Sequence, residues 1–343
     1  MGVFVFLPLV LPLTAWPVAR LAEQHLHPRT ATRLLTVLAV VLALCSTVCL
    51  ALVMVVGTAQ LPGNPLPDGW SDPEVRAAVP HDEVVGKAAI PALCAVVVAC
   101  ARTVRRHGRI RRRAHLALAG LPGTEVAVLP DAEPYAYALP PGGRRGGTVA
   151  PSGRRRAAGV RGPAVAAADG RDPRRGRGRV VVTTALLDRL RPGERRALFA
   201  HERAHLAARH DRFLLAVQLA ARANPFLRPL RTAVAYTAER WADEEAARAI
   251  GSRRTVARAI GTAALVSRGT PHPTLAGLAA HGPVPRRVAA LLGPAPAARH
   301  WPPAFTAVGL AAWGAAAGTA ASAMSSANSA VTMVLILHAA TPL

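Results

Sequence analysis

The chain has 343 residues, of which 51% are hydrophobic, and a formal net charge of +23. Basic charge on this scale is typical of nucleic-acid-binding proteins. Lys87 is the only lysine, however, and the arginines lie among abundant alanine, glycine and proline, a bias typical of a GC-rich bacterial coding sequence. The arginine-rich stretch 142–178 has no aromatic residue to stack on a base. We therefore expect no nucleic-acid partner. We read 142–178 as a disordered loop that is either solvated or rests on anionic lipid headgroups.

Four apolar stretches predict a membrane protein. Three are residues 3–20, 34–56 and 84–102, and the fourth lies within 301–343. About 20 apolar residues are enough to cross a bilayer as a helix. The first stretch could instead be a signal peptide, but it lacks a basic start and a small-residue cleavage site, which favours an anchor. All four cysteines lie in these stretches, and we read them as small apolar residues.

The charges between these stretches predict their orientation. Arginines dominate the segment between the first and second stretches and the segment Arg102–Arg113 after the third, whereas acidic residues dominate between the second and third. The positive-inside rule places the arginine-rich segments in the cytoplasm. We expect a multi-pass protein of the cell membrane, with a membrane region at 1–103, a cytosolic domain at 104–300 and a last span within 301–343.

One short motif predicts a metal site. His201-Glu202-Arg203-Ala204-His205 reads H-E-x-x-H. A helix is expected to start at Leu190–Glu194 and to run to about Arg222, where Asn224-Pro225 ends it. Residues four apart share a helix face, so both histidines can bind one zinc ion and Glu202 can reach a water bound to it. The alternative is a pair of surface histidines on an ordinary helix.

A second predicted helix, Pro229 to Ile250, ends at Gly251 and carries acidic residues. Glu239 and Asp243 share one of its faces. We expect Glu239 to be the third zinc ligand and Asp243 to bind the far nitrogen of a ligand histidine. The alternative is that both are solvated charges paired with neighbouring arginines.

The segment Leu190–Asp211 resembles the motif helix of integral-membrane gluzincin metallopeptidases. These include the prenyl-protein (CAAX) proteases, the heat-shock membrane proteases and the protease domain of the penicillin-sensing antirepressors. Tyr135–Leu139 resembles the strand that these enzymes place along the active-site cleft, and Gly178–Leu187 resembles the strand before the motif helix. Ala280–Val288 resembles their late T-H-P-P-x-x-x-R-[IV] element, although Gly282 replaces the first proline and no threonine precedes His281.

Three spans before the motif and one after it are most similar to the antirepressors, whose large extracellular sensor has no counterpart in this sequence. The resemblance implies a mainly α membrane protein, with four transmembrane helices and a cytosolic α+β gluzincin domain that contains a small sheet. It implies a zinc-dependent endopeptidase anchored in the lipid bilayer that cleaves a cytosolic protein, such as a transcriptional repressor. A quality-control or prenyl-type processing protease and a non-catalytic transmembrane signalling scaffold are the alternatives.

Catalysis by such a site needs a base and a donor to the oxyanion. Glu202 is the expected base, and His281, Arg287 and Tyr236, in that order, are the candidate donors. The Tyr135–Leu139 segment is expected to offer an edge along which an extended peptide substrate adds as a strand.

Overall fold

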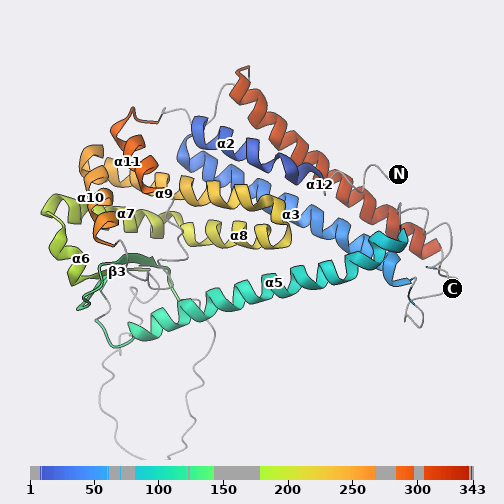
Figure 1. Ribbon diagram of the computed structural model, residues 1–343, viewed down its shortest axis with the longest axis horizontal. Coiled ribbons are helices and arrows are strands. Elements are labelled where there is room, and N and C mark those ends of the chain that lie inside the picture. Colours follow the sequence, from blue (N-terminus) through green and yellow to red (C-terminus); the bar gives the residue numbers. More distant parts are fainter. Residues whose placement is uncertain are drawn as a thin grey trace, which may run out of the picture.

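The computed structural model describes residues 8, 10–59, 61, 70, 82–122, 124–142, 178–267, 283–296, 305–339 and 341. Within these residues the chain is mainly helical, with one small sheet at one end of the molecule (Figure 1). Most of the predicted loop 142–178 and the candidate donor His281 lie outside the described residues.

Three of the described helices are long and apolar enough to cross a membrane. They are α3 (Pro28–Ala59), α5 (Asp82–Ala117) from Val84 onward, and α12 (Ala307–Ala339). Helices α3 and α5 cross where Gly57 meets Gly86, and a Cβ added at Gly57 would lie 2.2 Å from the backbone of Gly86. Glycines at a crossing let two membrane helices approach closely, so this pair joins α3 to α5.

The first predicted span is less regular than expected. Its described part forms a single-turn 3-10 helix, η1 (Leu11–Thr14), followed by α2 (Ala15–His25). At 1.5 Å per residue, α2 is about 16 Å long, roughly half the thickness of a bilayer core. Residues 3–7 and 9 lie outside the described part of the chain, so a fourth span stays a prediction.

Helix α5 continues far beyond its apolar stretch. We expected a cytoplasmic connection at Arg102–Arg113, and the structure shows that this segment is the last part of the same helix, which runs to Ala117. Arginine is a good helix former, so the change in polarity does not end the helix. The end of α5 therefore reaches the small sheet (Figure 1).

The sheet has three strands, in the order β1 (Val126–Leu129), β3 (Arg179–Thr183), β2 (Ala136–Leu139). The central strand β3 pairs parallel to β1 and antiparallel to β2. Its Val180–Val182 run is fully buried, as is typical of a central strand. The expected strands at Tyr135–Leu139 and after Gly178 are confirmed, and β2 lies at an edge of the described sheet.

The remaining helices are α6 (Thr184–Arg189), α7 (Pro192–Ala208), α8 (His210–Ala223), η3 (Pro225–Leu227), α9 (Arg228–Ile250), α10 (Arg253–Val266) and α11 (Val284–Leu292). The prediction of one helix as far as Arg222 is wrong, because Arg209 breaks it. Arg209 has φ 54° and ψ 48°, the left-handed conformation, which ends α7 and starts α8 in a new direction.

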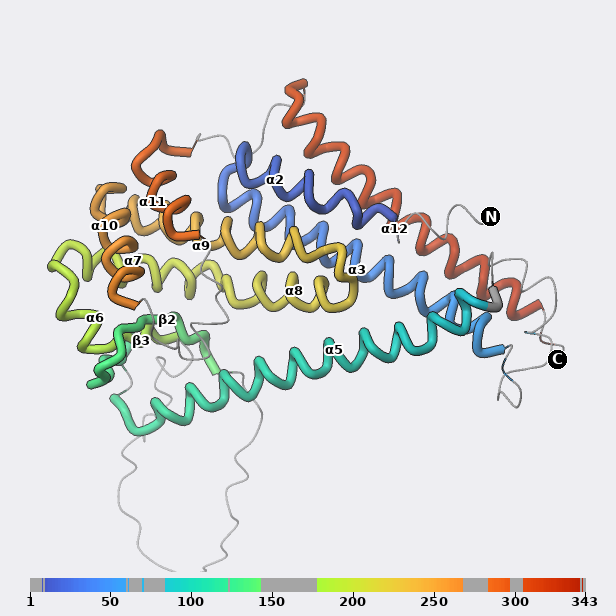
Figure 2. The backbone as a smooth tube through the Cα atoms, viewed as in Figure 1, coloured from blue at the N-terminus to red at the C-terminus, as the bar shows by residue number. Residues whose placement is uncertain are grey.

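Helix α9 connects the helices α2, α3 and α8 to the motif helix α7 (Figure 2). Near its start it packs against α2, α3 and α8, through a core that includes Leu230 and Val234. Near its end it packs against α7, α10 and α11 through Ala246 and Ala247. It ends at Gly251, which has φ 73°, as the sequence predicts. Three acidic residues of α9 between these two cores, Glu239, Asp243 and Glu244, are buried and therefore need partners.

Candidate metal centre

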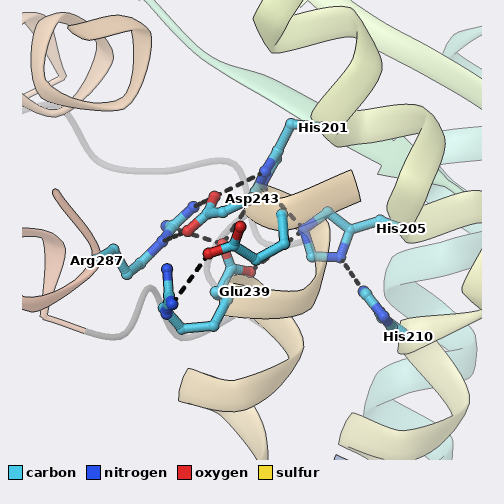
Figure 3. A network of polar contacts seen from close by, with 8 residues as sticks. His201, His205, His210, Glu239, Asp243 and Arg287 are labelled. Carbon is cyan, nitrogen blue, oxygen red and sulfur yellow. Dashed lines mark hydrogen bonds and ion pairs between the residues drawn. The ribbon is translucent and has the colours of Figure 1, made fainter. Parts of the chain in front are cut away.

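Helices α7 and α9 bring three candidate ligands together. Nε2 of His201 lies 3.1 Å from Nε2 of His205, and each of these nitrogens lies 3.5 Å from a carboxylate oxygen of Glu239 (Figure 3). Donor atoms about 2.05 Å from a tetrahedral zinc ion lie about 3.3 Å from one another. The three donors therefore already have the spacing that one zinc ion requires, and they form a group that could hold a metal.

Asp243 holds the first histidine in place. One turn after Glu239 on α9, its Oδ1 lies 3.0 Å from Nδ1 of His201. A neutral imidazole that binds metal through Nε2 carries its proton on Nδ1, so His201 donates to Asp243 in that state. In that state the carboxylate of Asp243 would fix both the tautomer and the ring orientation of this candidate ligand.

Arg287 of α11 joins the two carboxylates. It donates from Nε and Nη2 to the two oxygens of Asp243, at 2.9 and 2.6 Å, and its Nη1 lies 2.8 Å from Oε2 of Glu239. Its side chain is 3% exposed, so these are buried ion pairs. A guanidinium group has the geometry for such a bidentate contact, and it offsets the negative charge of two buried carboxylates.

The second histidine has a partner, His210, that the sequence pattern did not predict. Nδ1 of His210 lies 2.8 Å from Nδ1 of His205. When His205 binds metal through Nε2, its Nδ1–H can donate to the lone pair of His210. His210 is 1% exposed and lies edge-on against Trp241 of α9, with ring centroids 4.7 Å apart. Each ligand histidine thus has a buried group behind it.

The break at Arg209 explains why this contact is hard to predict. Residues five apart on a continuous helix point about 140° away from each other. The left-handed turn redirects the chain so that His210, the first residue of α8, faces back to His205. A helical projection of the sequence therefore separates two side chains that the structure brings into contact.

Burial and charge set unusual pKa values for the ligands. Burial alone would lower the pKa of His201, but the carboxylates of Asp243 and Glu239 outweigh it and raise that pKa to about 10. Burial lowers the pKa of His205 to about 4. Against the effect of burial, Arg287 and His205 hold the pKa of Glu239 well below its usual range. These shifts favour an ionised Glu239 and a protonated His201.

Glu202 has the properties of a general base. Burial raises the pKa of Glu202 to about 7, while the charges of His201 and Arg287 and a backbone contact with Ala138 lower it. A carboxylate with a pKa near neutrality can both accept and return a proton. It lines the same cavity as the three ligands.

This cavity of about 100 Å³ lies between the motif helix and the edge of the sheet. Its lining includes the three ligands, Glu202 and the β2 residues Ala136, Tyr137 and Ala138. Tyr135 bonds through its backbone to Thr183 of β3. The backbone N–H and C=O groups of successive residues in a strand point to alternate sides. Those of Ala136 and Ala138 therefore point away from β3, to the outer edge of β2. That edge faces the cavity.

The three candidate oxyanion donors have different surroundings. Arg287 contacts Asp243 and Glu239, as described above. Tyr236 is buried on α9, and the guanidinium of Arg286 lies 4.3 Å above its ring. Tyr236 is absent from the described lining of the cavity, and His281 is outside the described residues. The oxyanion role of each stays a prediction.

Comparison with protein families gives one finding. Residues 166–222 match the model of peptidase family M48, and the match covers the sheet strand β3, the motif helix and most of α8. The match supports a metallopeptidase of the M48 type. Neither the curated proteins nor the solved structures give a match to this chain.

Proposed function

We propose that the chain is a membrane-anchored, zinc-dependent endopeptidase that cleaves a cytosolic protein. The observation that carries the proposal is the spacing of the donor atoms of His201, His205 and Glu239, together with Glu202 in the same cavity. Two imidazoles and one carboxylate form a typical catalytic zinc set, which leaves a position for water. When bound, zinc would act as a Lewis acid on a water molecule and on the scissile carbonyl.

The protein residues have distinct tasks in this reaction. Glu202 accepts a proton from the attacking water on its carboxylate and later gives that proton to the leaving amine. Asp243 and His210 hold the ligand imidazoles in position, and Arg287 keeps Glu239 ionised. In this proposal the outer edge of β2 in the described sheet binds the substrate backbone as an added strand, which positions an internal peptide bond over the site and supports an endopeptidase.

The positions of the arginines support a cytosolic catalytic site. Arg29 and Arg33, at the start of α3, lie 5.5 and 5.4 Å from the ring centroid of Trp241, which packs against His210. The arginine-rich end of α5 also reaches the metal centre, because His107 and Arg111 line the cavity. The basic ends of two apolar helices therefore lie beside the site, and basic ends favour the cytoplasmic face.

The resemblance to the antirepressors suggests a transcriptional repressor as the substrate. The proposal can be tested in cells by comparing new protein termini in the cytosol after expression of the wild type or of Glu202→Gln. We expect a repressor to be cut only with the wild type. Cleavage of membrane proteins instead would favour a quality-control or prenyl-processing enzyme.

Glu202→Gln is also the test of catalysis itself. The full-length protein is purified in liposomes, supplied with zinc and incubated with a proteome-derived peptide library, whose products are read by mass spectrometry. We expect cleavage to fall about 10²- to 10⁴-fold, with zinc content unchanged. Glu125→Gln is the matched control, because Glu125 is exposed and pairs with Arg203 outside the cavity. Equal cleavage by Glu202→Gln and the control would contradict the proposal and favour a scaffold.

A further inference from the structure

A second cavity of about 870 Å³ lies beside the metal centre and is lined mainly by the arginine-rich end of α5. Arg105, Arg109 and Arg112 recur at positions i, i+4 and i+7, so they form one stripe along the helix. All three are exposed. Among the described residues, none of the three has an acidic partner, whereas Arg111 pairs with Asp211. This cavity, called here the arginine groove, is a strongly positive surface with unused charge.

The arginine groove is continuous with the catalytic cavity. The side chains of His107, Arg111 and Leu215 line both. Arg111 also donates from Nη2 to the carbonyl oxygen of Pro141, at 2.8 Å, just after the end of β2. Gly142, the next residue, lines the groove. A substrate peptide that lies along β2 and extends past the carboxyl end of that strand therefore enters the arginine groove.

We infer that the arginine groove is a substrate subsite that binds acidic side chains of the peptide, on one side of the cleaved bond. This inference rests on the proposed function. Ala138 lies beside Glu202 and Gly142 lies at the groove, four positions further along the chain. An extended peptide advances about 3.3 Å per residue. The acidic residues of a substrate therefore lie about three to six positions from the cleaved bond.

Two observations favour a peptide over a lipid headgroup or a segment of this chain. The apolar stretch of α5 ends near Ala101. Arg109 and Arg112 lie eight and eleven residues further, about 12 and 16 Å along the helix and beyond the headgroup layer, whereas Arg105, about 6 Å along, lies at the edge of that layer. The segment 143–177, which follows Gly142, has ten arginines and two aspartates, so its charge does not complement the groove. We therefore take the acidic partner of the groove to be another molecule.

Direct binding tests the groove without catalysis. The full-length Glu202→Gln protein is titrated into a fluorescein-labelled peptide with a run of glutamates, and into the same peptide with glutamines instead. We expect the acidic peptide to bind about tenfold more tightly at low salt, because each partly exposed ion pair contributes modestly. The preference should shrink in high salt. Equal binding of both peptides would overturn the inference.

Two double variants of the arginine groove and one control double variant locate the effect. Arg105→Gln/Arg112→Gln should remove the preference, and Arg105→Glu/Arg112→Glu should reverse it towards a lysine peptide. Arg102→Gln/Arg106→Gln is the control, because it removes the same charge from exposed positions of the same helix that do not line the groove. An equal loss of preference in the control would show general electrostatic attraction and would overturn a specific groove.

Cleavage then separates this inference from the proposed function. With catalytically intact protein, we expect kcat/KM for the acidic peptide to exceed that for the glutamine peptide by about tenfold, and the groove variant to cleave both equally. Equal cleavage of both peptides by the wild type would overturn the subsite and leave the peptidase intact. If adding phosphatidylglycerol vesicles abolishes cleavage of both peptides, the groove binds lipid, and the subsite is overturned. If the wild type cleaves neither peptide, the peptidase proposal fails, and the binding titration still decides whether the groove is selective for acidic peptides.

Discussion

Replacing His210 by phenylalanine should weaken zinc binding without unfolding the protein. The ring of His210 packs on Trp241, and a phenyl ring keeps that packing but removes Nδ1, which lies 2.8 Å from Nδ1 of His205. Removing a group that orients a ligand histidine typically costs 10- to 100-fold in metal affinity. This loss of affinity corresponds to about 1.4 to 2.7 kcal/mol of binding free energy. We expect this loss in a competition titration against a chromophoric zinc chelator.

The stability of the metal-free protein separates this effect from a packing defect. Nε2 of His210 is buried and has no hydrogen-bond partner in the described part of the chain. Phenylalanine removes this unpaired polar atom but also leaves Nδ1 of His205 without its partner. These two effects oppose each other, so the metal-free variant should unfold at nearly the same temperature as the wild type. His210→Asn, which can place an oxygen near Nδ1 of His205, should recover part of the affinity. An unchanged zinc affinity in His210→Phe would refute the role of His210, and a large fall in the unfolding temperature would point to packing.

Three further predictions concern the charge and the topology of the chain. The raised pKa of His201, about 10 without metal, means that zinc must displace a proton at neutral pH, so the zinc dissociation constant should fall about tenfold per pH unit between about 6.5 and 8.5. A flat profile in the same chelator titration would contradict this. Arg287→Met leaves two buried carboxylates without their cation and should lower the free energy of unfolding by about 3 to 5 kcal/mol in urea titrations, against less than about 1 kcal/mol for Arg248→Met, which removes a more exposed ion pair with Glu245. Equal losses would show that the buried pairs are unimportant. Alkaline phosphatase fused after Leu61 should be active and the same enzyme fused after Leu118 inactive, because the proposed orientation puts the first point outside and the second in the cytosol. The reverse pattern would place the catalytic site outside.

Local rules were enough to find most of the metal centre. His201 and His205 are four residues apart, and the helix period alone puts them on one face. Pro192 and Gly251 mark helix ends that the structure confirms, because each has a backbone preference that acts locally. The edge strand at Tyr135–Leu139 is also present, although its identification depended on a resemblance rather than on periodicity.

Contacts between distant or irregular segments were not predictable in the same way. A non-glycine residue in the left-handed region is uncommon, so no local rule places the break at Arg209, and the pairing of His210 with His205 depends on that break. Arg287 lies 44 residues beyond Asp243, and its bidentate contact depends on how α11 packs against α9. Apolar length also failed to show that α5 continues as a helix through its arginines.

The X-ray absorption spectrum at the zinc edge of the purified full-length protein tests the account most directly. We expect the spectrum to show one zinc ion per chain, with two imidazole nitrogens and oxygen donors at about 2.0 to 2.2 Å. We expect this signal to be lost in Glu239→Ala. A sulfur neighbour at about 2.3 Å, or the same spectrum in Glu239→Ala as in the wild type, would contradict a zinc centre built from His201, His205 and Glu239.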